Sequence, residues 1–305
     1  MKILFTGGSS FTGYHFISEL SKNKKYKIFC SLQKKINTYK GIRYERIKLL
    51  SKIKNIVLLE QVNFGDKKFI KILKKNNFKV ICLHHSHTKN YNSDKNFNLK
   101  KSINRNLFNI DKVFRNLNKK TLLVVSNTVF QDIKSKKYKA VNNYGVSKTI
   151  FYNEIKKFCN LYKINFKSVY ITNPWGIFEE KKLNFNMINC WAKNKEFILQ
   201  YPNYIRDNIY INKLRREYSA LIKDKSKKIE YFPSGYCSSN KVFVEAFRKK
   251  FEKYFKIKAH IKYLHSSKHD QPIKRINGLK INKKIIIKEN LNSYFSYYKK
   301  KFFKS

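Results

Sequence analysis

Cysteine and long apolar runs are sparse in this chain, and each shortage excludes a class of protein. Five cysteines are scattered along the sequence, and no two are spaced as Cys-x-x-Cys; they are Cys30, Cys82, Cys159, Cys190 and Cys237. This pattern argues against a disulfide scaffold or a structural zinc site and fits a reducing cytoplasm, which is where we expect the protein to act. No apolar run approaches the roughly 18 residues needed to span a bilayer. Gly7 interrupts the first apolar run before it resembles a secretion signal.

Acidic residues are also scarce. The chain has 19 Asp and Glu residues against 68 Lys and Arg residues, a formal net charge of +49. Such an excess suggests a polyanion such as nucleic acid as the partner. The lysines, however, are spread from end to end among abundant Asn, Ile, Tyr and Phe, the residues that A/T-rich codons specify. We therefore attribute the charge to genome composition and do not expect a nucleic-acid partner.

What the chain does have is length and an alternating pattern. Its 305 residues, 42% of them hydrophobic, suffice for one large or two intimate domains. Apolar runs separated by amphipathic stretches predict an α/β fold with a Rossmann-type doubly wound parallel sheet. These runs are 2–5, 27–31, 56–59, 80–83, 121–125 and 168–172. We expect this domain over residues 1–173 and a smaller, mainly C-terminal α/β substrate lobe over residues 174–305, partly interleaved with the first domain.

The first twenty residues run from an apolar strand into a glycine-rich turn and then into a helical pattern. This order is typical of a turn that binds the pyrophosphate of a dinucleotide. Gly7 permits the tight turn, and Gly13 lets the helix lie close to the sheet with its N-terminus aimed at phosphate. The spacing calls for a third glycine where the chain has Ser10, a residue that adds bulk but could donate to a phosphate. An ordinary strand-to-helix turn is the alternative.

A tyrosine and a lysine stand four residues apart in the stretch Asn143-Tyr144-Gly-Val-Ser-Lys148. On a helix both side chains emerge on one face, one turn apart. An ammonium beside a phenol favours the phenolate, so we expect Lys148 to lower the pKa of Tyr144 and to make it an acid/base for a sugar or alcohol oxygen. Ser126 follows an apolar run, where its hydroxyl can hold the same oxygen. The alternative is a surface pair.

These motifs together resemble the extended short-chain dehydrogenase/reductases, specifically the NAD(P)-dependent sugar-nucleotide epimerase/dehydratase family. The resemblance covers nearly the whole chain and implies a first domain that binds NAD(P), with Ser126, Tyr144 and Lys148 as the catalytic triad. It implies cofactor contacts from Gly7, Ser10, Phe11, Thr12, Gly13, Gln33, Lys34, Asn63, His84, Asn104, Tyr144 and Lys148. Asn104 is expected to begin a central helix. The resemblance implies substrate contacts from Ser126, Thr128, Asn173 and Arg206, the arginine holding the nucleotide diphosphate. It also implies a homodimer.

The end of the second strand bears on the choice of cofactor. NAD-selective sites place an acid there for the ribose hydroxyls, whereas NADP-selective sites place a base for the 2′-phosphate. Residues 30–35 read Cys-Ser-Leu-Gln-Lys-Lys, with no acid and with Lys34 and Lys35 at the end. The sequence therefore favours NADP over NAD.

Departures from the family pattern narrow the reaction. Dehydratases of the family carry an acidic pair directly after the catalytic hydroxyl residue, where this chain has Asn127 and Thr128. Neither can serve as that acid or base, so we disfavour a dehydratase and expect a 4-epimerase or keto-sugar reductase of a nucleotide-linked sugar, in a pathway that supplies a polysaccharide. A catalytically decayed member of the fold that binds RNA or another polyanion is the alternative.

Several further residues are chemically notable but are assigned no separate catalytic or metal-binding role. His84, His85 and His87 are clustered but have no acidic partner at metal-ligand spacing, so we interpret them as lining the cofactor and expect no metal. We assign no catalytic role to Glu179 and Glu180. Tyr170 stands where the family often has an arginine. Residues 268–271 are candidates for approaching the diphosphate or sugar.

Overall fold

The computed structural model describes residues 1–264 and 271–303. The chain divides into two compact units: unit 1 comprises Met1–Ile171 and Arg215–Phe232, and unit 2 comprises Thr172–Leu214 and Pro233–Ser305. The first segment of unit 1 ends two residues before the expected boundary at 173. The chain returns to unit 1 at Arg215–Phe232. Among the described residues, no helix is both long enough and apolar enough to cross a membrane.

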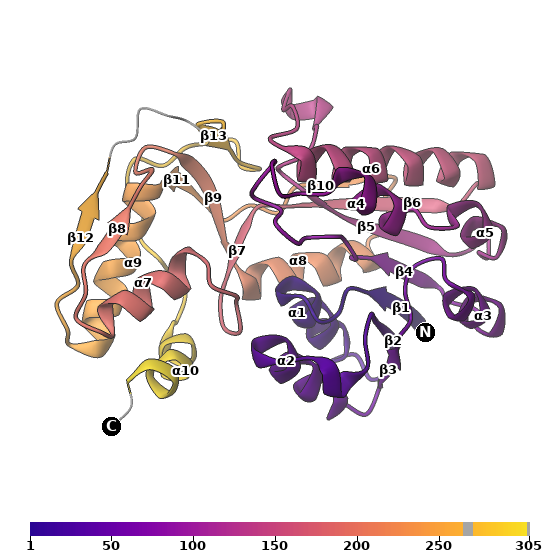
Figure 1. Cartoon of the computed structure of the whole chain (residues 1–305), viewed down its shortest axis with the longest axis horizontal. Coiled ribbons are helices and arrows are strands. Elements are labelled where there is room, and N and C mark those ends of the chain that lie inside the picture. The colour runs from indigo at the N-terminus through magenta and orange to yellow at the C-terminus, as the bar shows by residue number, and fades with distance from the viewer. Residues whose placement is uncertain (265–270, 304–305) are drawn as a thin grey trace. The chain divides into compact units, whose positions relative to one another are not determined.

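Unit 1 is built on a seven-stranded sheet in which every pairing is parallel (Figure 1). In spatial order its strands are β10 (Glu230–Tyr231), β6 (Asn165–Ile171), β5 (Leu122–Thr128), β4 (Val80–Leu83), β1 (Lys2–Thr6), β2 (Lys27–Leu32) and β3 (Ile56–Glu60). The chain order reverses between β4 and β1. This is the doubly wound Rossmann arrangement that the alternating apolar runs predict, and it places strand ends beside the site described below.

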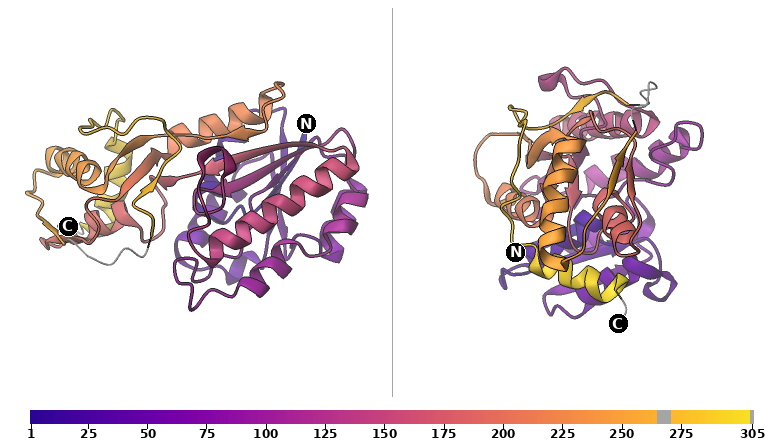
Figure 2. Two further views of the ribbon diagram at one scale, coloured as in Figure 1. Left: turned by 90° about the horizontal axis from the view of Figure 1, so that it is seen from above. Right: turned by 90° about the vertical axis from the view of Figure 1, so that its left-hand side faces the viewer.

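Helices cover both faces of this sheet. They are α1 (Phe11–Leu20), α2 (Gly41–Ser51), α3 (Lys67–Lys75), α4 (Leu99–Asn106), α5 (Ile110–Arg115), α6 (Asn143–Tyr162) and the later part of α8 (Ile211–Lys223), with short 3-10 turns η1 (Ile36–Thr38) and η2 (Lys134–Lys136). The long helix α6 runs along one face (Figure 2). There Phe151, Ile155 and Cys159 pack with α3 and α5 in one apolar core. On the other face, Tyr218 of α8 stacks on Phe16 of α1 at 3.9 Å between ring centroids.

Unit 2 holds short strands and helices around an aromatic core. A four-stranded sheet joins β11 (Tyr236–Ser239), β9 (Ile205–Tyr210), β13 (Lys274–Arg275) and β7 (Asn173–Trp175), and a separate pair joins β8 (Phe197–Leu199) and β12 (Ile261–Tyr263). The helices are α7 (Leu183–Trp191), α9 (Asn240–Phe255) and α10 (Asn292–Phe302). Trp175, Phe247 and Tyr294 meet edge to face, with centroids within 6.1 Å of one another. Aromatic contacts of this kind stabilise the unit beyond the burial of their area.

Candidate active site

The glycine-rich turn closes on itself after β1. Gly7 has a φ of +76°, and a Cβ atom there would lie 2.7 Å from the carbonyl oxygen of His84. At Gly13 a Cβ atom would lie 2.5 Å from the carbonyl oxygen of Gly7. Gly7 therefore lets the turn lie against the segment after β4, and Gly13 lets the N-terminus of α1 lie against the turn. A helix N-terminus behind two glycines fits the pyrophosphate of a dinucleotide.

Ser10 is accommodated within this turn. Its Oγ atom donates to the carbonyl oxygen of Gly7 at 2.9 Å and accepts from the backbone N–H of Gly13 at 3.1 Å. Ser10 is thus the N-cap of α1, and its hydroxyl serves the turn rather than pointing toward a phosphate. The side chain of Phe11 is buried, with the Arg46 guanidinium over its ring at 5.9 Å. Only backbone atoms of Phe11 can therefore face a ligand.

The residues that follow β2 are exposed, and an acid lies beside them that the sequence analysis missed. Gln33, Lys34 and Lys35 are all exposed. Glu60, at the end of the neighbouring strand β3, accepts a hydrogen bond at 2.9 Å from the backbone N–H of Ile36. The position of Glu60 directly after the apolar run 56–59 was the sequence signal that could have found it, and in the sheet Glu60 pairs with Leu32. The exposed Asn63 lies beyond the same strand.

The segment after β4 brings His84 to two hydroxyl groups. Its Nε2 atom lies 2.9 Å from Thr12 Oγ1, and its Nδ1 atom lies 2.6 Å from Ser126 Oγ. Desolvation of the imidazole, with a smaller contribution from the nearby Lys148, lowers the pKa of His84 to about 3. The ring is therefore neutral at physiological pH, with one nitrogen as donor and the other as acceptor.

Asn104 does not occupy the position we expected. It lies exposed near the end of α4 rather than at its beginning. The buried asparagine is Asn106, whose Oδ1 accepts from the backbone N–H of His87 at 3.2 Å and whose Nδ2 donates to Ser102 at 3.3 Å. Residues two apart on a helix point in different directions, so the buried amide is Asn106.

Lys148 reaches Ser126 from α6. Its Nζ atom donates to the carbonyl oxygen of Ser126 at 2.7 Å, and its ammonium lies 5.0 Å from the ring centre of Phe151. Burial lowers the pKa of Lys148 to about 7. Ser126 and Thr128 lie within β5 rather than after it, and Asn127 between them is buried. The two amide side-chain atoms of Asn127 have no hydrogen-bond partner among the described residues.

Tyr144 lies one turn before Lys148, but its surroundings differ from the expectation. Its ring meets Tyr91 at 5.6 Å and Phe97 at 5.9 Å, both nearly edge to face. Burial raises the pKa of the Tyr144 phenol to about 12, and the neighbouring Ser86 hydroxyl offsets only part of this rise. The expected lowering of this pKa by Lys148 is therefore wrong, because burial of the phenol is the largest influence on its pKa.

The segment that carries Tyr91 is fastened to the start of α6. The carboxylate of Asp94 accepts from the backbone N–H of Asn143 at 2.6 Å, and Asn142 donates to the carbonyl oxygen of Tyr91 at 2.9 Å. No periodic pattern in the sequence predicts this docking. It is the physical reason that the Tyr144 ring is enclosed.

Of the two predicted substrate-binding residues in unit 2, Arg206 is buried more deeply than Asn173. It donates to the carbonyl oxygen of Ile273 at 2.8 Å and to Gln271 at 3.3 Å, and it lies over the Tyr204 ring at 4.5 Å. Burial lowers the pKa of Arg206 to about 10, and the guanidinium stays charged at neutral pH. Asn173 begins β7 and is half-buried. Of the candidates at 268–271, only Gln271 lies within the described residues.

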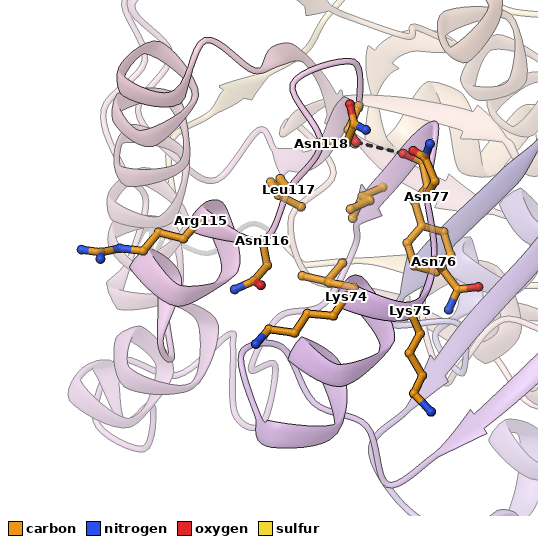
Figure 3. Close-up of a pocket in the computed structure, with 12 residues that line it drawn as sticks. Lys74, Lys75, Asn76, Asn77, Arg115, Asn116, Leu117 and Asn118 are labelled. Carbon is orange, nitrogen blue, oxygen red and sulfur yellow. Dashed lines mark hydrogen bonds between the residues drawn. The ribbon is translucent and has the colours of Figure 1, made fainter.

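A pocket elsewhere in unit 1 is separate from these residues. It measures about 380 Å³ and lies beside the loops that precede β4 and β5, at the amino-terminal edge of the sheet (Figure 3). Its lining is polar and basic, with Lys74, Lys75 and Arg115 among the residues drawn. The turn after β1, His84 and Ser126 lie at the opposite, carboxyl-terminal edge, which is where doubly wound sheets bind ligands.

The fold and the glycine-rich turn define a dinucleotide-binding protein of Rossmann type. The sequence model of the NAD dependent epimerase/dehydratase family matches residues 3–230, and the chain belongs to this family. A comparison with curated proteins finds no match.

Solved structures of sugar-nucleotide enzymes share the fold. The UDP-glucuronic acid 4-epimerase of Bacillus cereus, in complex with UDP-glucuronic acid and NAD, is 16% identical over 99% of this chain and 100% of its own, with a TM-score of 0.77. The UDP-glucose 4-epimerase of Thermotoga maritima is 16% identical over 99% of each chain, with a TM-score of 0.72. The dTDP-glucose 4,6-dehydratase of Bacillus anthracis, in complex with NAD, is 17% identical over 98% of this chain and 97% of its own, with a TM-score of 0.74. At these identities the likeness concerns the fold.

Proposed function

We propose that the protein transfers a hydride between a nicotinamide cofactor and one carbon of a nucleotide-linked sugar, as a 4-epimerase or a keto-sugar reductase. The observation that carries this proposal is the contact of Lys148 with Ser126, one helical turn from Tyr144 and beside the turn that holds Gly7 and Gly13. Family membership supports it. The cofactor would occupy the glycine-rich turn and would supply or accept the hydride.

In this proposal, side chains of the protein donate the proton and position the reacting oxygen. A phenol with a pKa near 12 is protonated at neutral pH, so Tyr144 is suited to give a proton to a carbonyl oxygen as that oxygen becomes an alcohol. The Ser126 hydroxyl would hydrogen-bond the same oxygen and hold it in place. Lys148 would fix the end of β5 through its bond to the Ser126 carbonyl and would add positive charge near the site when protonated.

The pair Asn127 and Thr128 supports an epimerase or reductase over a dehydratase. A dehydration needs an acid and a base next to the reacting carbons, and an amide and an alcohol provide neither. Dehydratases are among the proteins with a similar fold, so this argument depends on the two side chains alone.

Charge at the end of β2 supports NADP as the preferred cofactor. Lys34 and Lys35 are exposed and can meet a 2′-phosphate, whereas the Glu60 carboxylate beside them opposes it. Replacing Glu60 by Gln should therefore raise the preference for NADPH by about two- to fivefold, the size of one exposed charge interaction. Fluorescence titration of the variant and the wild type with NADPH and NADH measures this.

Substrate binding and assembly complete the proposal. Arg206 would pair with the diphosphate of the nucleotide sugar, and Asn173 and Thr128 would contact the sugar. We also propose a cytoplasmic homodimer that forms through α4 and α6, and light scattering on the purified protein tests the dimer. A monomer at micromolar concentration would contradict it.

One experiment tests the reaction class. The purified protein is denatured, released nucleotides are identified by mass spectrometry, and the stripped protein is titrated with NADPH and NADH. Bound NAD(H) supports an epimerase, which recycles its own cofactor, and tight NADPH binding to an empty protein supports a reductase. Binding of neither contradicts the proposal and favours polyanion binding, for which strongly salt-dependent RNA affinity that Tyr144→Phe does not change is the expected sign.

A further inference from the structure

The His84 imidazole joins two parts of unit 1 that the sequence analysis treated separately. Thr12 belongs to the first turn of α1, which follows the glycine-rich turn, and Ser126 belongs to β5. His84 lies between them, with Nε2 at 2.9 Å from Thr12 Oγ1 and Nδ1 at 2.6 Å from Ser126 Oγ. The backbone N–H of His84 also donates to Thr6 Oγ1 at 2.9 Å, which fixes the residue from the opposite side.

Packing restricts the ring further. Its centroid lies 5.4 Å from that of Phe16 and 5.6 Å from that of Phe5. A ring held by two hydroxyl groups and two aromatic neighbours has little freedom to turn away from Ser126. The nearby ionisable groups that act on it are Lys148 and His85, and both disfavour a second proton on the imidazole.

We propose that His84 is a positioning residue that fixes the direction of the Ser126 hydroxyl and couples it to Thr12. A neutral imidazole has one donor and one acceptor nitrogen, so its tautomer decides the direction of both hydrogen bonds. With the proton on Nδ1, His84 donates to Ser126 and leaves the Ser126 O–H free to donate to a substrate oxygen. With the proton on Nε2, His84 accepts from Ser126 and leaves the Ser126 oxygen free to accept. A carbonyl substrate needs the first state, and an alcohol substrate is served by the second.

The catalytic meaning of this inference rests on the proposed function, but the hydrogen-bond chain can be tested without a substrate or cofactor. Nitrogen-15 spectra of histidine-labelled protein are recorded for the wild type, Thr12→Val and Ser126→Ala, with His84→Asn to assign the signals. His84 should remain neutral from pH 5 to pH 9, and its ring-nitrogen shifts should change in both variants. Ordinary titration of His84, or shifts that neither variant changes, would overturn the proposal.

A matched pair of variants tests the role in hydride transfer. The amide of Asn reaches the position of Nδ1, and the amide of Gln reaches that of Nε2. His84→Asn should therefore keep the contact with Ser126, whereas His84→Gln should lose it. With NADPH and UDP-4-keto-glucose as the probe, His84→Gln should lower kcat by about 100-fold, the effect of a misplaced group, and leave the KM for the sugar nucleotide nearly unchanged. His84→Asn should lower kcat less.

A double-variant cycle separates positioning from a general structural effect. His84→Gln combined with Ser126→Ala should be no slower than Ser126→Ala alone, because the two residues act through one hydroxyl. Fully additive losses would overturn the proposal. His260→Gln, at an exposed position of unit 2, is the control and should behave like the wild type. If neither the wild type nor any variant reacts with the probe, the proposed function fails on this substrate. The nitrogen-15 result still decides whether the hydrogen bonds from Thr12 through His84 to Ser126 exist.

Discussion

The Nζ atom of Lys148 lies 2.7 Å from the carbonyl oxygen of Ser126, and no carboxylate of the described residues forms an ion pair with it. A buried ammonium held only by a neutral acceptor is costly. This cost explains the pKa of about 7 for Lys148, because burial disfavours the charged form. A residue that opposes folding at neutral pH is typical of a functional site.

Lys148→Met should stabilise the protein and inactivate it. At pH 6 to 7 the variant should gain about 1 to 2 kcal/mol in free energy of unfolding, because it removes a buried charge. Between the folded pKa of about 7 and the usual value of 10.5 the unfolded state binds more protons, so the gain should shrink as pH rises through this range. Urea denaturation at pH 6.5 and 9.5 measures both values. A variant that is less stable at pH 6.5 would contradict this account.

Tyr144→Phe should abolish the proton transfer without loosening the fold. We expect kcat to fall by about 100- to 10,000-fold, the usual contribution of a general acid. Since the acid form of the phenol persists to a pKa of about 12, the wild-type rate of carbonyl reduction should stay flat from pH 8.5 to 10, a range above the pKa of about 7 of Lys148. Steady-state kinetics across this range checks both statements. Tyr152→Phe, on the same helix but bonded to Glu230 at 2.9 Å, is the control, and an inflection of the wild-type rate between pH 8.5 and 10 would argue against the enclosed phenol.

Substitutions at Gly13 and Ser10 of the glycine-rich turn should affect NADH binding differently. Gly13→Ala should weaken NADH binding more than tenfold, because a Cβ atom 2.5 Å from the Gly7 carbonyl forces the turn to open. Ser10→Ala should cost about 0.5 to 2 kcal/mol of stability, the value of an N-cap. Ser10→Gly should bind NADH within about threefold of the wild type, because the lost hydroxyl bonds only the turn and a glycine N-cap costs little. Calorimetric titration of each variant with NADH measures these affinities. A large gain in affinity for Ser10→Gly would mean that the hydroxyl obstructs the cofactor.

Glu179 predicts a pH-dependent stability of unit 2. Burial raises the pKa of Glu179 to about 8 from the usual 4.5, and its Oε1 atom accepts from the Tyr294 hydroxyl at 3.2 Å. Between pH 4.5 and pH 8 the folded state therefore binds more protons than the unfolded state, so the contribution of this group falls as pH rises. Glu179→Gln should match the wild type at pH 5 and exceed it by about 1 to 3 kcal/mol at pH 8.5. Thermal unfolding at both pH values tests this, with the exposed Glu196→Gln as control; equal stabilities at pH 8.5 would refute it.

The sheet of unit 1 was predictable because parallel strands are buried on both faces and give continuous apolar runs. The seventh strand was not. β10 contains only Glu230 and Tyr231, and its position depends on tertiary contacts, in which the hydroxyls of Tyr152 and Tyr170 donate to the Glu230 carboxylate at 2.9 and 2.8 Å. Two polar residues carry no periodic signal.

The candidate site was predictable where local geometry defines it. Gly7 and Gly13 are required by a turn that the sequence shows directly, and Ser126 follows from the strand that carries it. The position of Tyr144 depends on a distant segment, in which Tyr91 and Asp94 dock on α6. The choice of Asn106 over Asn104 could have been made from the sequence, because Asn106 shares a helix face with Leu99 and Ile103 and Asn104 does not.

The return of the chain to unit 1 at Arg215–Phe232 also sets an order of events during synthesis. The edge strand β10 pairs with β6 through Glu230 and Tyr231, sixty residues after β6 has left the ribosome. Until then the nascent sheet has an open edge at β6, and the hydroxyls of Tyr152 and Tyr170 lack their carboxylate. A fragment that stops at residue 171 would keep that edge open permanently. Such edges pair with other chains, so the isolated fragment should aggregate where the full-length protein does not.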